Sequence, residues 1–210
     1  MRTPNRYLLL FFFVTVFISL ALGKQVFASE HPKKFTVITT VAPITNMVRN
    51  IGGVYIDVIG VVPDGVDSHT FEPIPSDIKT LQAADLIIAN GLDLELPTLK
   101  LAEKVKKPAT RVVQLGNRTL KEEDWQYDFS FPREHGHPNP HLWLNIQLVM
   151  QYAEIIRDSL SELDPKHQEQ YFLNTETYLA KLTKLDQAIF ACVKTIPAKN
   201  RKLVTYHDSF

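Results

Sequence analysis

Three of the seven histidines in the chain lie at places where a protein could gather metal ligands. His69 lies in a loop after an apolar run, His141 comes just before a helical stretch, and His207 ends another apolar run. Imidazole is the commonest metal-ligating side chain, and three neutral nitrogens at about 2.0–2.1 Å suit Zn²⁺. Gaps of 72 and 66 residues leave two interpretations open: one shared metal site, or three separate histidines satisfied by hydrogen bonds.

The elements that would position these histidines follow an alternating pattern. Short apolar runs rich in β-branched residues predict strands, and amphipathic stretches between them predict helices. The predicted strands cover 35–41, 56–62, 84–89 and 111–115, and helices follow from Pro43, Ser76 and Leu94. This alternation is typical of α/β proteins with a parallel sheet. Such sheets bind ligands at the loops beyond the carboxyl ends of their strands.

The second half of the chain predicts mainly helix. A polar, proline-containing loop is expected over 117–140, then a helix over 146–163 and a longer one over 165–196. The longer helix would extend about 48 Å at 1.5 Å per residue. Two interpretations remain open for it: one arm of a helical hairpin on the sheet, or a rigid strut between two lobes. A strand over 202–206 would begin a second α/β lobe that is incomplete in this chain.

The N-terminal segment predicts export. Arg2 and Arg6 precede an uncharged apolar run from Tyr7 to Leu22, and small residues follow near position 28. This pattern is typical of a secretory signal peptide over residues 1–28, although an uncleaved membrane anchor is the alternative. The sequence around the cleavage region contains no cysteine for lipid attachment, which favours a periplasmic protein. Cys192, the single cysteine, is expected to be buried as a small apolar residue.

Composition and charge exclude several classes of protein. The 23 basic and 23 acidic residues balance, which argues against binding to nucleic acid. An apolar fraction of 45% argues against disorder, and one cysteine excludes a disulfide framework or a cysteine-rich zinc module.

Three segments resemble the ligand motifs of the TroA-like solute-binding proteins of zinc and manganese ABC importers. Residues 62–73 read VPDGVDSHTFEP, residues 139–145 read NPHLWLN, and residues 205–210 read TYHDSF. The three motifs occur in family order, and the resemblance covers about residues 35–210. Asn139 departs from the pattern, because many relatives carry Asp at this position before Pro-His.

The resemblance implies two α/β lobes joined by a long rigid helix, with the metal held in the cleft between the lobes. The corresponding division is an N-terminal lobe over 35–163, an interlobe helix over 165–196 and the first strand of the second lobe over 201–210. His69 and His141 would be ligands from the first lobe, and His207 would open the second. A further carboxylate ligand, which relatives often supply late in the second lobe, has no counterpart in this chain.

Metal and partners follow from the same resemblance. Histidine as the third ligand favours Zn²⁺, with Mn²⁺ as the alternative, because manganese prefers a carboxylate there. The loop histidines His135 and His137 form a thin version of the histidine-rich loop of zinc-type relatives, or an ordinary solvated loop. Asp67, Glu72 and Trp143 either orient the ligands or serve capping and packing. The expected partner is the membrane permease of the importer, and the protein is expected to be monomeric.

Two other functions are weighed against metal delivery. A zinc hydrolase could use three histidines to hold an activated water, but the sequence contains no H-E-x-x-H helix and no G-x-S-x-G elbow. A fragment that binds no metal could serve as a surface adhesion or interaction module. The sequence therefore predicts a metal-binding protein that is not an enzyme.

Overall fold

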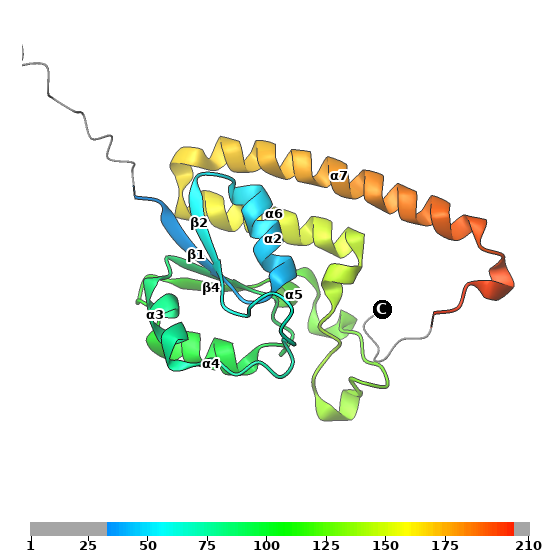
Figure 1. Ribbon diagram of the computed structural model, residues 1–210, viewed down its shortest axis with the longest axis horizontal. Coiled ribbons are helices and arrows are strands. Elements are labelled where there is room, and N and C mark those ends of the chain that lie inside the picture. Colours follow the sequence, from blue (N-terminus) through cyan, green and yellow to red (C-terminus); the bar gives the residue numbers. More distant parts are fainter. Residues whose placement is uncertain (1–32, 204–210) are drawn as a thin grey trace, which may run out of the picture. The chain divides into compact units, whose positions relative to one another are not determined.

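The computed structural model describes residues 33–203. Its centre is a parallel sheet of four strands, β1 (Phe35–Thr39), β2 (Ile56–Gly60), β3 (Leu86–Ala89) and β4 (Arg111–Gln114), in the order β2-β1-β3-β4 (Figure 1). Val37 lies opposite Val58 on one side and Leu86 on the other. The α/β class and the parallel sheet predicted from the alternating pattern are confirmed.

Both faces of the sheet are covered, because the side chains of each strand alternate between two apolar clusters. Val37, Leu86 and Ile88 pack with α2 (Ala42–Gly52), α6 (Ile146–Leu163) and α7 (Gln168–Thr195). Ile38 and Ile87 point the other way, toward α3 (Pro75–Ala83) and α4 (Leu96–Val105) (Figure 1). Strands buried on both faces explain the nearly continuous apolar runs in the sequence.

Helix and strand ends differ from the predicted ones by a few residues. The helix predicted to be capped by Ser76 begins at Pro75 instead, after Ile74, because proline suits the first helical turn. The α6 bounds agree with the prediction, and Asn145 caps this helix by accepting a hydrogen bond from the Gln147 N–H at 2.9 Å. The predicted loop after β4 contains a short helix, α5 (Leu115–Thr119).

The long helix α7 has two different halves. Its N-terminal half packs on α2 and α6 through Tyr171 and Leu182, which are 0% and 8% exposed. Beyond Leu182 the same apolar stripe is exposed, and Leu185 and Phe190 are 50% and 60% exposed. Twenty-eight residues give a length of about 42 Å, shorter than predicted because Pro165–His167 form a separate 3₁₀ turn.

Two sequence predictions are wrong, and others concern residues outside 33–203. Cys192, expected to be buried, is exposed, because it lies on the C-terminal half of α7, where the residues around it are exposed. Lys202 and Leu203, expected to begin a strand, are not in one. The predicted signal peptide over 1–28 and His207 lie outside the described residues. The structure contains no helix among residues 33–203 that is long and apolar enough to cross a membrane.

The two halves of α7 make a direct stability test. Replacing Leu182 by Ala removes a buried side chain and is expected to lower the free energy of unfolding by about 2–4 kcal/mol. Replacing Leu185 by Ala, three residues along the same helix, is expected to cost under about 1 kcal/mol because half of that side chain is already exposed. Chemical denaturation of both variants measures the difference. Equal losses would contradict the exposed state of this half.

Candidate metal centre

Two of the three predicted ligands come together in the described structure. The Nε2 atoms of His69 and His141 lie 3.1 Å apart, although the residues are 72 positions apart in the sequence. Two imidazole nitrogens bound to one tetrahedral Zn²⁺ at about 2.0–2.1 Å would lie about 3.3–3.4 Å apart. The two ring nitrogens are therefore close to the separation that a shared ion needs. Residues 33–203 contain no group of three metal-ligating side chains, and the third predicted ligand, His207, lies outside that range.

His69 is held at the end of a turn that follows β2. Gly65 adopts a left-handed φ of 81° in the turn, where Val66 N–H donates to the carbonyl of Pro63 at 3.1 Å. The carboxylate of Asp67 then accepts the backbone N–H of His69 at 2.9 Å. Asp67 thus orders the backbone of the segment that carries His69, which is one of the two roles that the sequence left open for it. His69 itself is exposed.

His141 is 8% exposed, and its ring is oriented by Asn139. Asn139 Nδ2 donates to the carboxylate of Asp128 at 2.5 Å, so the amide oxygen must face His141. That oxygen lies 2.7 Å from His141 Nδ1 and accepts a hydrogen bond from the Nδ1–H group. The neutral ring therefore carries its lone pair on Nε2, the atom that faces His69. The departure from Asp at position 139 keeps the acceptor oxygen.

Two aromatic side chains lie against the histidine pair. Phe131 lies 5.9 Å from the His69 ring and 5.6 Å from the His141 ring, centroid to centroid. Trp143 packs edge-on against His141 at 5.1 Å. Asp128 positions Phe131 because one carboxylate oxygen accepts the backbone N–H groups of Ser130 and Phe131 at 3.0 Å. The sequence singled out Trp143 but missed Asp128 and Phe131, since a polar loop gives no periodic signal.

Behind His141 lies a buried polar cluster at the carboxyl ends of β1 and β3. The carboxylate of Glu95 accepts hydrogen bonds from the Thr40 hydroxyl at 2.5 Å and from the N–H groups of Asn90 at 2.8 Å and Gly91 at 3.1 Å. Burial raises the pKa of Glu95, and these hydrogen bonds act in the opposite direction. Burial and the nearby charge of Glu95 also raise the pKa of Tyr152, so its hydroxyl keeps its proton.

The other histidines within residues 33–203 lie apart from the pair. His137 Nδ1 contacts the carboxylate of Asp93 at 2.9 Å, while His135 is exposed in the same loop. His167 is partly buried, with its Nδ1 2.6 Å from Asp164 and its ring on Tyr55. Glu72 is exposed, so an orienting role for it stays a prediction.

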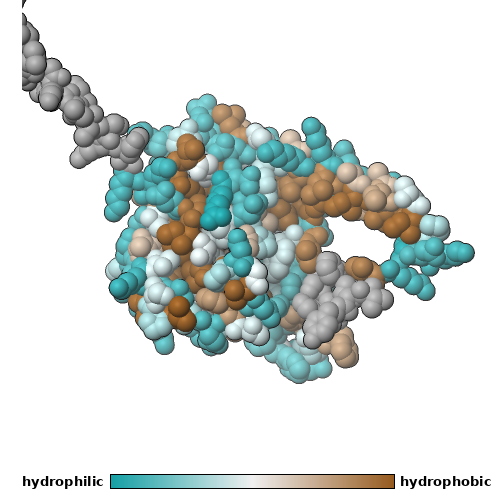
Figure 2. All heavy atoms as spheres, viewed as in Figure 1, coloured by the Kyte–Doolittle hydropathy of each residue, from teal (hydrophilic) through white to brown (hydrophobic). Residues whose placement is uncertain are grey.

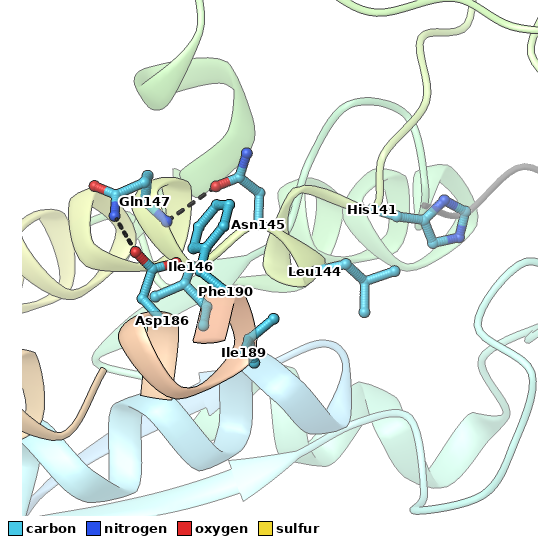
Figure 3. A pocket seen from close by; sticks show the side chains of 8 residues that line it. All are labelled: His141, Leu144, Asn145, Ile146, Gln147, Asp186, Ile189 and Phe190. Atoms are coloured by element: carbon cyan, nitrogen blue, oxygen red, sulfur yellow. Dashed lines mark hydrogen bonds between the residues drawn. The ribbon is translucent and has the colours of Figure 1, made fainter. Parts of the chain in front are cut away.

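A hollow of about 470 Å³ opens beside His141, between the start of α6 and the C-terminal half of α7 (Figure 3). Leu144 and Ile146 line it on one side, and Ile189 and Phe190 on the other. Gln147 and Asp186 join the two helices at its polar rim through a hydrogen bond of 3.1 Å. The exposed apolar half of α7 therefore continues toward the histidine pair.

Comparison with known proteins identifies the family of this chain. Residues 37–210 match the family model described as zinc-uptake complex component A, periplasmic. The chain is 35% identical over 182 residues to the iron-binding protein YfeA of Yersinia pestis, covering 87% of this chain and 56% of that protein. It is 34% identical over 217 residues to the manganese ABC transporter substrate-binding lipoprotein PsaA of Streptococcus mitis, covering 100% and 67%.

Solved structures agree. The periplasmic zinc-binding protein TroA of Treponema pallidum matches with a TM-score of 0.75 and 28% identity, over 84% of this chain and 61% of that one. A cadmium-bound periplasmic metal-binding protein from Candidatus Liberibacter asiaticus matches with a TM-score of 0.73 and 27% identity, over 84% and 63%. The chain thus spans about 60% of the length of these proteins. On the family match over residues 37–210, the chain belongs to the zinc-uptake complex component A family of periplasmic metal-binding proteins.

Proposed function

We propose that the protein binds one divalent metal ion through His69, His141 and His207 and delivers it to the permease of an ABC importer. The observation that carries the proposal is the pair of facing Nε2 atoms, 3.1 Å apart, with the lone pair of His141 aimed at His69. His207 joins the pair on the strength of its motif, which ends the region matched by the family model. PsaA, a relative named as the substrate-binding lipoprotein of a manganese ABC transporter, supports delivery to a permease and points away from an enzyme.

The ion proposed is Zn²⁺, with Mn²⁺ as the alternative. Imidazole nitrogens favour zinc over manganese, which prefers oxygen ligands. The relatives are named for iron, manganese and zinc, so the choice depends on the ligand set of this chain. An imidazole-rich centre is the feature that supports zinc.

The setting proposed for the protein is outside the cytoplasmic membrane, in a periplasm, as an exported monomer. The family description and the periplasmic relatives support this placement, whereas PsaA is named a lipoprotein. The charged segment before the apolar run 7–22 and the absence of a nearby cysteine in the sequence favour a cleaved leader without a lipid anchor.

The division into two lobes around α7 is also part of the proposal. An N-terminal lobe over 35–163 and an interlobe helix over 165–196 agree with the burial of α7, whose first half packs on α2 and α6. Its second half displays an apolar stripe, visible in Figure 2, that includes Leu185, Ile189 and Phe190. Residues 201–210 would begin the second lobe.

Single substitutions of the three histidines test the ligand set. His69→Ala, His141→Ala and His207→Ala are each expected to weaken zinc binding by more than the roughly 10–100-fold caused by loss of an outer partner. His167→Ala is the matched control, because this histidine pairs with Asp164 away from the centre. Competition titration with a zinc chelator measures the affinities. Unchanged affinity in the His69 and His141 variants would overturn the proposed site.

The role of Asn139 has its own test. Asn139→Ala removes the acceptor for His141 Nδ1 and is expected to weaken zinc binding by about 10–100-fold. Asn139→Asp keeps an acceptor oxygen but loses the Nδ2 donor to Asp128, so it is expected to lose less affinity than Asn139→Ala. Titration calorimetry on both variants measures the contrast. Equal loss in the two would show that the acceptor oxygen is not what matters.

Metal preference can be measured directly. A given site generally binds Mn²⁺ more weakly than Zn²⁺, and imidazole ligands suit zinc. The protein is therefore expected to bind zinc at least about tenfold more tightly than manganese. Parallel competition titrations with the two ions at pH 7.5 provide the ratio. A preference for manganese would indicate that oxygen ligands dominate the centre.

A further inference from the structure

The buried polar cluster behind His141 contains a bridge that the proposed ligand set does not use. Thr40, Asn90, Glu95 and Tyr152 are each at most 2% exposed, and they come from three separate segments of the sequence. Burying so many polar groups is costly unless each is hydrogen-bonded.

The side chain of Asn90 connects the sheet to the segment that carries His141. Its Nδ2 donates to the carbonyl of Pro140 at 2.9 Å and to the carbonyl of Gly91 at 3.1 Å. Its Oδ1 accepts a hydrogen bond from the Tyr152 hydroxyl at 3.1 Å. The Tyr152 hydroxyl thus orients the amide, since a donor on that side requires the oxygen there and the nitrogen toward Pro140.

The backbone of Asn90 is held on both sides. Its N–H donates to Glu95, and its carbonyl accepts the N–H of Gly116 at 2.8 Å. The turn that follows has three successive left-handed residues, Gly91, Leu92 and Asp93, with φ of 80°, 53° and 63°. Non-glycine residues in this conformation are strained, and they persist only where surrounding contacts hold the backbone in place. The Glu95 carboxylate, bonded to the N–H groups of Asn90 and Gly91, supplies part of that constraint.

Pro140 links the Asn90 side chain to the backbone of His141. Its ring fixes φ, and its carbonyl belongs to the peptide unit that includes the His141 nitrogen. The same carbonyl accepts the N–H of Leu142 at 2.9 Å, so the chain on both sides of His141 is tied to it. A shift of the Pro140 carbonyl would move the imidazole relative to His69, 3.1 Å away.

We propose that Asn90, anchored by Glu95 and oriented by Tyr152, is a positioning residue that holds the Pro140 carbonyl and thereby places the His141 imidazole before the metal arrives. The inference rests on the proposed metal-binding function. A ligand already in place loses less freedom when the ion binds, so affinity depends on the bridge. Asn90 acts through His141 and touches no metal itself.

The two buried tyrosines of the helical layer make a matched test. Tyr152→Phe removes the hydroxyl that orients Asn90, whereas Tyr171→Phe removes an equally buried hydroxyl that donates to Asp164 at 2.8 Å, at the junction of α6 and α7. Both variants lose one buried hydrogen bond and are expected to lower the melting temperature by similar amounts. Tyr152→Phe alone is expected to weaken zinc binding, by about tenfold, the lower end of the range for outer partners.

Two further measurements separate positioning from a general structural role. In a His141→Ala background, Tyr152→Phe is expected to cause no additional loss of zinc affinity, because the ligand it positions is gone. In the metal-free protein, nitrogen NMR of the imidazoles is expected to show altered His141 signals in Tyr152→Phe and unaltered ones in Tyr171→Phe.

The outcomes distinguish the inference from the proposed function. Equal zinc affinities for Tyr152→Phe and Tyr171→Phe, or an undiminished effect of Tyr152→Phe in the His141→Ala background, would overturn the positioning role while leaving the metal site intact. If His141→Ala itself leaves zinc affinity unchanged, the proposed function fails. In that case the NMR comparison alone tests the positioning role. Unaltered His141 signals in Tyr152→Phe would contradict a link from Asn90 to His141.

Discussion

The carboxylate of Glu95 lies between the carboxyl ends of β1 and β3, where a buried charge is tolerable only because donors surround it. The Thr40 hydroxyl and the N–H groups of Asn90 and Gly91 supply these donors, one from the end of β1 and two from the end of β3. Parallel strands in the order β2-β1-β3-β4 bring these ends to one edge. Ligands of open α/β sheets bind at this kind of edge, where the strand order reverses.

The two described histidines reach the centre in different ways. His141 is 8% exposed and its ring is oriented by Asn139 and covered by Trp143, while its backbone adjoins the Pro140 carbonyl. His69 is exposed at the end of a turn whose order comes from local hydrogen bonds. The proposed site therefore pairs a buried, oriented imidazole with an exposed one.

Burial along α7 shows why one sequence pattern was open to two interpretations. A continuous apolar stripe predicts that the helix packs on something over its whole length, and a hairpin or an interlobe strut would satisfy it equally. In the structure Tyr171 and Leu182 pack against α2 and α6, while Leu185 and Ile189 are exposed, so the interlobe strut stays a prediction. Cys192 was misplaced for the same reason, since apolar character alone does not say which half of a helix is covered.

Hydrophobic alternation determined the parallel α/β class, the positions of all four described strands within a few residues, and α6. The loop motifs identified His69 and His141 as partners. Only the tertiary structure revealed the contacts around them. Asn139 accepts a hydrogen bond from the His141 ring and donates to Asp128, and Asn90 donates to the Pro140 carbonyl, 50 positions away in the sequence. In the sequence, Asn90-Gly91 indicated no more than the end of a strand. A single polar residue that contacts a segment far away in the sequence leaves no periodic pattern. Its role depends on which strands the sheet brings together.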